Sequence, residues 1–182
     1  MKRFLRLFGK KSKKQPKLQY HVEYVFPGSQ NNKDNNNNQE TENRLLIIIK
    51  QYNEISKKLD SQENLKHLIV DDSESNRFIM SKYFEKLNIN YDIASNGLEA
   101  LEKISQNKYH IIWIDLKMPI LNGLETTKIL REFMNYNGTI IGVTGFSDQE
   151  TTQICKKIGF NKVIGKPITI DLIRDLLINN AF

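Results

Sequence analysis

From residue 67 to its end, the sequence alternates short apolar segments with longer amphipathic ones. The apolar segments have the β-branched content of buried strands and lie at residues 67–70, 91–94, 110–115, 139–144 and 161–165. The segments with helical spacing lie at residues 74–87, 97–106, 122–135, 148–158 and 169–179. Such alternation implies right-handed crossovers and a parallel sheet with helices on both faces. Residues 65–182 are therefore predicted to form a flavodoxin-like, doubly wound α/β domain with five strands and five helices.

The chain before residue 65 divides into three segments of different composition. Residues 1–18 form a basic tail. Residues 19–43 contain part of a weak strand pattern (residues 18–26), followed by an asparagine-rich run with nothing to bury, which predicts a disordered linker. Residues 44–62 are predicted to form an amphipathic linker helix. Its apolar stripe consists of Leu45, Ile48, Tyr52, Ile55 and Leu59.

The roles of the linker helix and the tail stay open at this point. The stripe over residues 44–59 is consistent with packing on the following domain, with a homodimeric coiled coil, or with a partner-binding helix. In the tail, Phe4, Leu5 and Phe8 lie on one side of a candidate helix and basic residues on another. Such a segment is consistent with an anionic membrane surface, with a nuclear-import or nucleic-acid patch, or with disorder.

The net charge of +6 does not indicate a nucleic-acid-binding fold, because the basic excess is confined to residues 1–18. The single cysteine, Cys155, excludes an internal disulfide and fits a reducing compartment. No apolar run approaches the roughly 20 residues that span a bilayer, and the N-terminus does not have the pattern of a secretory signal. We therefore expect a cytoplasmic protein, with peripheral membrane attachment as an option for the tail.

Polar side chains end four of the five predicted strands. Asp71 and Asp72 follow the first, Asp115 ends the third, Thr144 ends the fourth, and the fifth runs into Lys166. In a doubly wound sheet these ends meet at one edge. Each residue alone has an ordinary structural explanation, such as a helix cap or a loop. Together, three carboxylates that need a shared cation such as Mg²⁺, with a lysine and a hydroxyl for oxyanion oxygens, indicate a site that handles phosphoryl groups.

The segments that carry these residues resemble the receiver domain of response regulators in two-component phosphorelays. They are VDDSESNRFIMSKYFEKL, YDIASNGLEALEKI, IIWIDLKMPILNGLETTKILR, IIGVTG and GFNKVIGKP, and the resemblance covers residues 66–182. The NR pair at 76–77 and SNGLEAL at 95–101 are most similar to receivers attached to hybrid histidine kinases. The resemblance implies a phosphohistidine donor on a histidine kinase or a histidine phosphotransfer protein.

Residue roles follow from the resemblance, position by position. Asp115 is implied to be the nucleophile that becomes an aspartyl phosphate. Asp72 and Asp115 are implied to ligate Mg²⁺ together with the backbone carbonyl of Lys117, and Asp71 to act through a coordinated water. The receiver is expected to act only on itself, by phosphoryl transfer and slow autodephosphorylation, and to turn over no diffusible substrate.

The remaining implied roles concern the other strand ends and the loops. Lys166 is implied to contact one phosphoryl oxygen, and Thr144 to hydrogen-bond another after phosphorylation. Gly145 is expected to leave room at the site, and the Lys166–Pro167 bond to be cis. Gly123, in the loop after Asp115, is expected to permit a positive φ.

One position departs from the family. Val163 stands where the family often carries the Tyr or Phe ring that turns inward when the threonine engages the phosphate. A valine has no such rotamer exchange, so we expect phosphorylation to shift the loops after the fourth and fifth strands by another route.

Two alternatives to a phosphorelay receiver are kept. The first is a phosphorylation-silent interaction module with the same fold that dimerises through residues 44–59. The second is a hydrolase of phosphate esters that uses Asp115, although Lys117 stands where such enzymes carry a second aspartate. None of the three histidines lies in the pattern of a kinase's phosphoaccepting histidine, and no Gly-rich ATP-binding pattern occurs.

Overall fold

The computed structural model describes residues 5–9, 20–24, 35–55, 66–145 and 149–179. The chain divides into two compact units, Met1–Lys50 and Gln51–Phe182. Each unit is described by itself. Within the described residues, no helix is both long enough and apolar enough to cross a membrane.

The N-terminal unit contains a two-stranded antiparallel sheet. Strand β1 (Leu5–Gly9) pairs with β2 (Tyr20–Tyr24), and Leu5 lies opposite Tyr24. β2 lies inside residues 18–26, where a strand was predicted. The prediction of a tail helix is wrong for residues 5–9, which form a strand. A five-residue segment is too short to stabilise a helix alone, whereas pairing with β2 satisfies the backbone groups that face that strand.

Helix α1 spans Asn35–Ile55 and therefore begins nine residues before the predicted start at 44, inside the run predicted to be disordered. The prediction of disorder is corrected for residues 35–43. Helix propagation gains one hydrogen bond for each added residue, so a helix that forms over the apolar stripe extends into a polar neighbour. Glu40 and Glu42 are good helix formers in that extension. Residues 56–62 of the predicted helix lie outside the described residues.

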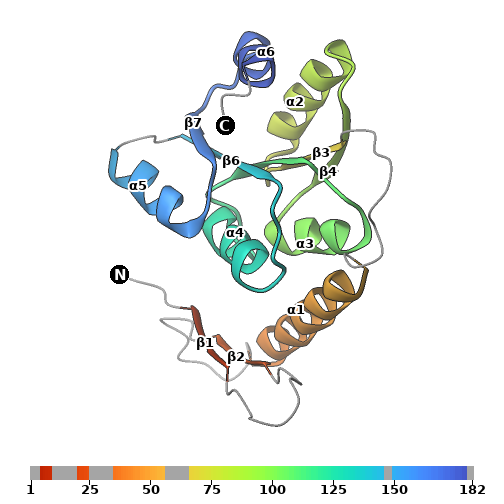
Figure 1. Cartoon of the computed structure of the whole chain (residues 1–182), viewed down its shortest axis with the longest axis vertical. Coiled ribbons are helices and arrows are strands. Elements are labelled where there is room, and N and C mark those ends of the chain that lie inside the picture. The colour runs from red at the N-terminus through yellow and green to blue at the C-terminus, as the bar shows by residue number, and fades with distance from the viewer. Residues whose placement is uncertain (1–4, 10–19, 25–34, 56–65, 146–148, 180–182) are drawn as a thin grey trace. The chain divides into compact units, whose positions relative to one another are not determined.

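The second unit contains one parallel sheet of five strands in the order β4-β3-β5-β6-β7. In Figure 1, α2 and α6 lie on one face of this sheet and α3, α4 and α5 on the other. The strands are β3 (Lys66–Val70), β4 (Asn90–Ala94), β5 (Ile111–Asp115), β6 (Thr139–Thr144) and β7 (Lys162–Gly165). The helices are α2 (Glu74–Lys86), α3 (Gly97–Gln106), α4 (Gly123–Glu132), α5 (Gln149–Ile158) and α6 (Ile170–Ile178). The predicted flavodoxin-like fold is confirmed.

Four of these helices begin at a polar residue whose side chain accepts a hydrogen bond from the backbone N–H three positions later. The capping residues are Ser73, Asn96, Asn122 and Thr169. Each cap satisfies one backbone N–H that the helix itself leaves unpaired. The caps set where these helices begin: the capping residue lies two to four residues after the strand end for α2, α3 and α6, and seven residues after it for α4.

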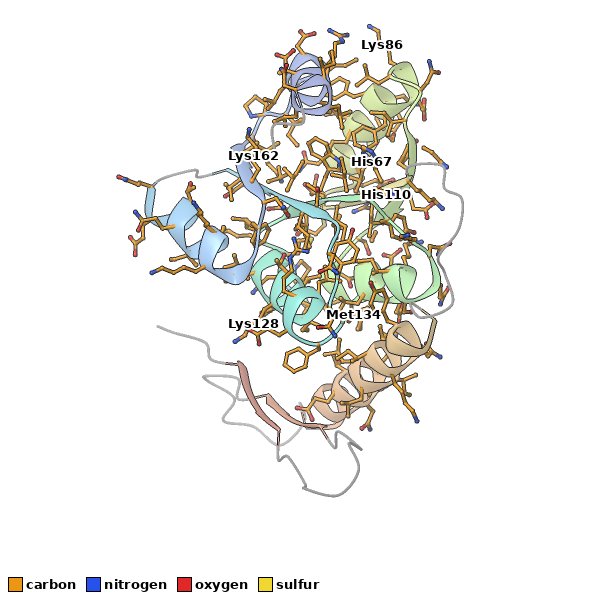
Figure 2. The ribbon with its side chains drawn as sticks, in the orientation of Figure 1. His67, Lys86, His110, Lys128, Met134 and Lys162 are labelled. Atoms are coloured by element: carbon orange, nitrogen blue, oxygen red, sulfur yellow. The ribbon has the colours of Figure 1, made fainter. Side chains whose placement is uncertain are left out.

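The core between the sheet and helices α2 and α6 contains a cluster of rings. Trp113 of β5 donates a hydrogen bond from Nε1 to Nδ1 of His67 on β3, at 3.3 Å. Phe84 of α2 makes edge-to-face contacts with both rings, at centroid distances of 5.5 Å to His67 and 5.8 Å to Trp113. Figure 2 shows His67 inside the domain and Lys86 at the outer end of α2. Strands β3 and β5 and helix α2 are therefore joined beneath the edge that carries the acidic residues.

The loop after β5 corrects one prediction. Gly123 is not among the residues with positive φ; in this loop Ile120 is, at 68°. A Cβ at Gly123 would lie 2.3 Å from the carbonyl oxygen of Asp115. Glycine is therefore required at Gly123 by the close approach of α4 to the end of β5, and not by the backbone conformation of residue 123.

His67 makes stability depend on pH. It is 5% exposed, and burial, together with the charge of His110, lowers its pKa to about 4 from the usual 6.5. Between these values the unfolded chain binds a proton that the folded one does not. The contribution of neutral His67 to the free energy of unfolding is therefore complete above about pH 6.5, and it is lost as the pH falls toward 4. We expect the free energy of unfolding to be about 1–2 kcal/mol lower at about pH 5 than at about pH 7.

The measurement is urea unfolding of the wild type and of His67→Gln at both pH values. Glutamine keeps an acceptor for Trp113 but does not titrate in this range, so the variant should show a smaller loss of stability at low pH. His21→Gln, the matched control outside the domain, should behave as the wild type. An equal loss in His67→Gln and the wild type would refute the role of His67.

Candidate functional site

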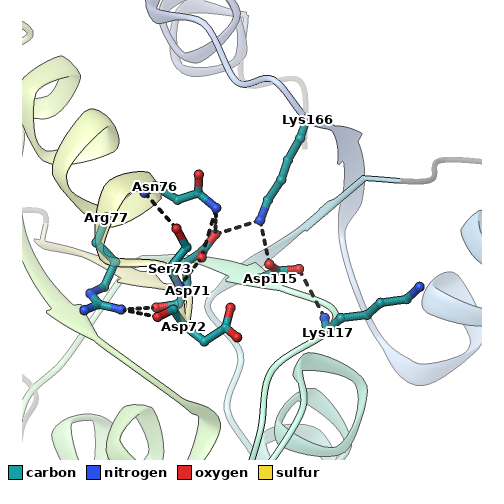
Figure 3. A network of polar contacts seen from close by, with 8 residues as sticks. All are labelled: Asp71, Asp72, Ser73, Asn76, Arg77, Asp115, Lys117 and Lys166. Atoms are coloured by element: carbon teal, nitrogen blue, oxygen red, sulfur yellow. Dashed lines mark hydrogen bonds and ion pairs between the residues drawn. The ribbon is translucent and has the colours of Figure 1, made fainter.

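Three carboxylates meet at the carboxyl edge of the sheet. Asp71 and Asp72 follow β3, and Asp115 ends β5. One oxygen from each carboxylate lies within 4.8 Å of the others. Asp71 and Asp115 are 3% and 8% exposed, whereas Asp72 is exposed. The strand ends therefore bring together the three acidic residues that the sequence pointed to, as Figure 3 shows.

Lys166, just after β7, lies between two of these carboxylates. Its Nζ donates to Oδ2 of Asp115 at 2.5 Å and to Oδ2 of Asp71 at 2.8 Å. Burial lowers the pKa of Lys166, but the hydrogen bonds and charges of Asp115 and Asp71 outweigh burial and leave the pKa above its usual value. The ammonium group is therefore charged at neutral pH and offsets part of the negative charge at the site.

Asp71 has further partners from the start of α2. The backbone N–H of Ser73 donates to its Oδ1 at 2.9 Å. The side-chain amide of Asn76 donates to both of its oxygens, at 3.1 Å each. Together with Lys166, these donors engage both oxygens of a buried carboxylate, which removes most of the cost of burying its charge.

Arg77 binds the main chain of the acidic pair. Its Nη1 donates to the carbonyl oxygen of Asp71 at 2.6 Å and to that of Asp72 at 3.0 Å (Figure 3). From the sequence, Asn76 and Arg77 are recognised only as markers of a receiver subtype, and their contacts with the acidic pair are not predicted. The available signal was their spacing, since both lie on the first turn of the helix that Ser73 caps, directly after the acidic pair.

Asp115 is held from the loop that follows it. The backbone N–H of Lys117 donates to Oδ1 of Asp115 at 3.1 Å, and the side chain of Lys117 is exposed and points away from the acidic cluster (Figure 3). Both oxygens of Asp115 thus accept a hydrogen bond, one from Lys117 and one from Lys166. The carboxylate is fixed in orientation at the edge of the sheet.

The remaining predicted site residues lie along β6 and β7. Thr144 is buried at the end of β6, and its carbonyl accepts from the backbone N–H of Lys166 at 2.7 Å. The Lys166–Pro167 bond is cis, as predicted. Gly145 is exposed, and a Cβ there would meet no described atom within 4 Å. Val163 is half-buried on β7, opposite Gly142 of β6.

The arrangement suits a hard divalent cation. Asp71, Asp72 and Asp115 each offer one carboxylate oxygen, and the exposure of Asp72 leaves the cluster open to solvent. Such oxygen ligands match Mg²⁺, which keeps some of its water and binds through a few carboxylates and substrate oxygens. The charged Lys166 on the buried side is placed to contact an anionic oxygen. The arrangement can therefore bind a cation and a phosphoryl group side by side.

Comparison with known proteins identifies the domain. Residues 68–178 match the family model of the response regulator receiver domain. The chain is 37% identical over 116 residues to hybrid signal transduction histidine kinase E of Dictyostelium discoideum. The matched region is 61% of this chain but only 7% of that kinase. It is 36% identical over 118 residues to two-component response regulator 24 of Arabidopsis thaliana, covering 64% of this chain and 84% of that protein.

Solved structures agree with these relatives. The receiver domain of the Francisella response regulator 1452 has a TM-score of 0.57 and 35% identity, covering 65% of this chain and 100% of that one. The receiver domain of Saccharomyces cerevisiae Ssk1, solved with the histidine phosphotransfer protein Ypd1, has a TM-score of 0.58 and 26% identity. The match covers 63% of this chain and 87% of that one. The family match takes in most of β3 and every later element through α6, and this protein therefore belongs to the response regulator receiver domain family of phosphorelay proteins.

Proposed function

We propose that this receiver accepts a phosphoryl group on Asp115 from a phosphohistidine, with Mg²⁺ bound at the acidic cluster. The observation that carries the proposal is the position of Lys166, whose Nζ contacts both Asp115 and Asp71 within an acidic cluster that includes Asp72. Three carboxylates and one lysine are the charges needed to gather a cation and a phosphoryl group around one carboxylate oxygen.

The chemistry is positioning and charge compensation. A carboxylate is a weak nucleophile, so its orientation by Lys117 and Lys166 matters more than its basicity. A bond forms between an Asp115 oxygen and phosphorus while the bond from phosphorus to the donor's histidine nitrogen breaks. Lys166 offsets negative charge that spreads over the phosphoryl oxygens in a loose transition state.

Asp72, Asp115 and the carbonyl of Lys117 would hold Mg²⁺, with Asp71 acting through a water. When bound, the ion supplies positive charge against the carboxylates and the phosphoryl oxygens. The described donor set supports this assignment, because it consists of oxygens alone and the exposed Asp72 can reach a partly hydrated ion.

Thr144 is proposed to read the phosphorylated state. Its position at the end of β6, next to the strand of Asp115, allows its hydroxyl to hydrogen-bond a phosphoryl oxygen, and Gly145 adds no side chain there. Val163 has no ring to rotate, so movement of Thr144 would be transmitted through the β6 and β7 loops themselves.

The donor is proposed to be a histidine kinase or a histidine phosphotransfer protein. The relatives named as hybrid histidine kinases and the Ssk1 receiver solved with Ypd1 support this class of partner. The receiver would act on itself and turn over no diffusible substrate. A dimer through residues 44–59 and an anionic membrane surface for residues 1–18 stay predictions.

The first test is replacement of Asp115. Incubation with acetyl phosphate and Mg²⁺ should add the mass of one phosphoryl group to the wild type and none to Asp115→Asn, because the amide is not a nucleophile for phosphorus. Intact mass spectrometry measures this directly. Asp175→Asn, an exposed carboxylate on α6, is the matched control and should be modified as the wild type is.

Two other outcomes have a definite meaning. A wild type that gains no mass from acetyl phosphate or from a phosphorylated histidine donor would support the phosphorylation-silent module. Sustained release of phosphate from generic phosphate esters would support the hydrolase.

The second test concerns Lys166. Lys166→Ala removes the charge that contacts Asp115, so we expect the initial rate of phosphorylation to fall by about 10²–10³-fold, as for loss of one preorganised charge-stabilising donor. Affinity for Mg²⁺ should stay equal or rise, because a competing positive charge is gone. Lys162→Ala, at the start of β7, the strand that precedes Lys166, is the control. A rate within a few-fold of the wild type would contradict the role of Lys166.

A further inference from the structure

The two residues of the acidic pair are held in different ways. The Asp71 carboxylate accepts hydrogen bonds from Ser73, Asn76 and Lys166. Within the described part of the chain, Asp72 is bonded through its main-chain carbonyl to Arg77, and its carboxylate has no hydrogen bond. The place of the Asp72 side chain in the cluster therefore depends on the main chain that carries it.

Arg77 is the side chain that fixes this main chain. One nitrogen, Nη1, donates to two consecutive carbonyls, at 2.6 Å to Asp71 and 3.0 Å to Asp72. Two contacts to adjacent peptide groups restrict the rotation of both. Hydrogen bonds from a charged donor are about twice as strong as neutral ones, and Arg77 is half-buried on α2, a helix whose start is capped by Ser73.

We propose that Arg77 is a positioning residue for the cation site: it orients the Asp71–Asp72 main chain so that the Asp72 carboxylate faces the Asp115 side of the cluster. This inference rests on the proposed function, since it concerns the metal at that site. Arg77 touches neither the cation nor the phosphoryl group, and it acts only through the peptide groups it binds.

The direction in which cation affinity changes when Arg77 is replaced distinguishes a positioning role from a purely electrostatic one. Arg77 carries a positive charge next to a site for a cation, so removal of that charge by itself should strengthen cation binding. Loss of positioning should weaken it, because groups that orient metal ligands typically contribute 10–100-fold to metal affinity. A general structural role would lower stability without changing the affinity of the folded protein.

The experiment titrates the full chain with Mn²⁺, without any phosphodonor, and measures free Mn²⁺ by electron paramagnetic resonance, with Mg²⁺ in competition. Mn²⁺ is a suitable probe because it prefers the same oxygen ligands. We expect the Kd to rise about tenfold or more in Arg77→Met and in Arg77→Ala. Lys82→Met removes a lysine from the same helix, where it pairs with Glu85, and should leave the Kd near that of the wild type. Thermal melting shows which variants are folded, and Met keeps the packing of the arginine stem if Ala does not fold.

A double-mutant cycle with Asp72→Asn completes the test. Once the Asp72 carboxylate is gone, replacement of Arg77 should weaken Mn²⁺ binding no further. The positioning role would be overturned if Arg77→Met bound Mn²⁺ as tightly as the wild type or more tightly. It would also be overturned if replacing Arg77 raised the Kd by the same factor in the Asp72→Asn background as in the wild type. A wild type that binds no Mn²⁺, or an Asp72→Asn variant that binds it equally well, would instead refute the proposed cation site itself.

Discussion

The parallel register between β3 and β5 is the constraint on which the site depends. Ile69 lies opposite Trp113, so two residues further on Asp71 and Asp115 leave the two strands side by side. Side chains two residues apart on a strand point to the same face, so both carboxylates follow the core residues Ile69 and Trp113. A shift of β5 by one residue would turn the Asp115 side chain to the other face of the sheet, away from Asp71, and would take Trp113 away from His67 and Phe84.

The apolar side chains therefore enforce the geometry of the polar site. Trp113, His67 and Phe84 form a buried cluster that joins β3, β5 and α2. The cluster packs α2 against both strands near the end of the helix, and the start of the same helix carries the groups that bind the acidic pair. The core stabilises the domain, and at the same time it sets where the carboxylates can stand.

Charge at the edge of the sheet is balanced unevenly. Asp71 and Asp115 are buried and share Lys166, so each has a cationic partner and further donors. Asp72 is exposed and keeps its solvation. Burial of an unpaired carboxylate would be costly, so the carboxylate without a hydrogen bond among the described residues is the one that stands at the surface.

The sequence by itself determined the order of strands and helices, because apolar periodicity is local, and it placed Asp71, Asp115, Thr144 and Lys166 at strand ends. Because the carboxyl ends of the strands lie at one edge of a doubly wound sheet, the sequence also implied that these residues meet. It did not reveal the contacts of Asn76 and Arg77, the reason for glycine at Gly123 or the start of α1 at Asn35. The first two depend on how the start of a helix lies against the strand end that precedes it, and the third on how far a helix propagates. Only packing in three dimensions decides which polar atoms come within hydrogen-bonding distance.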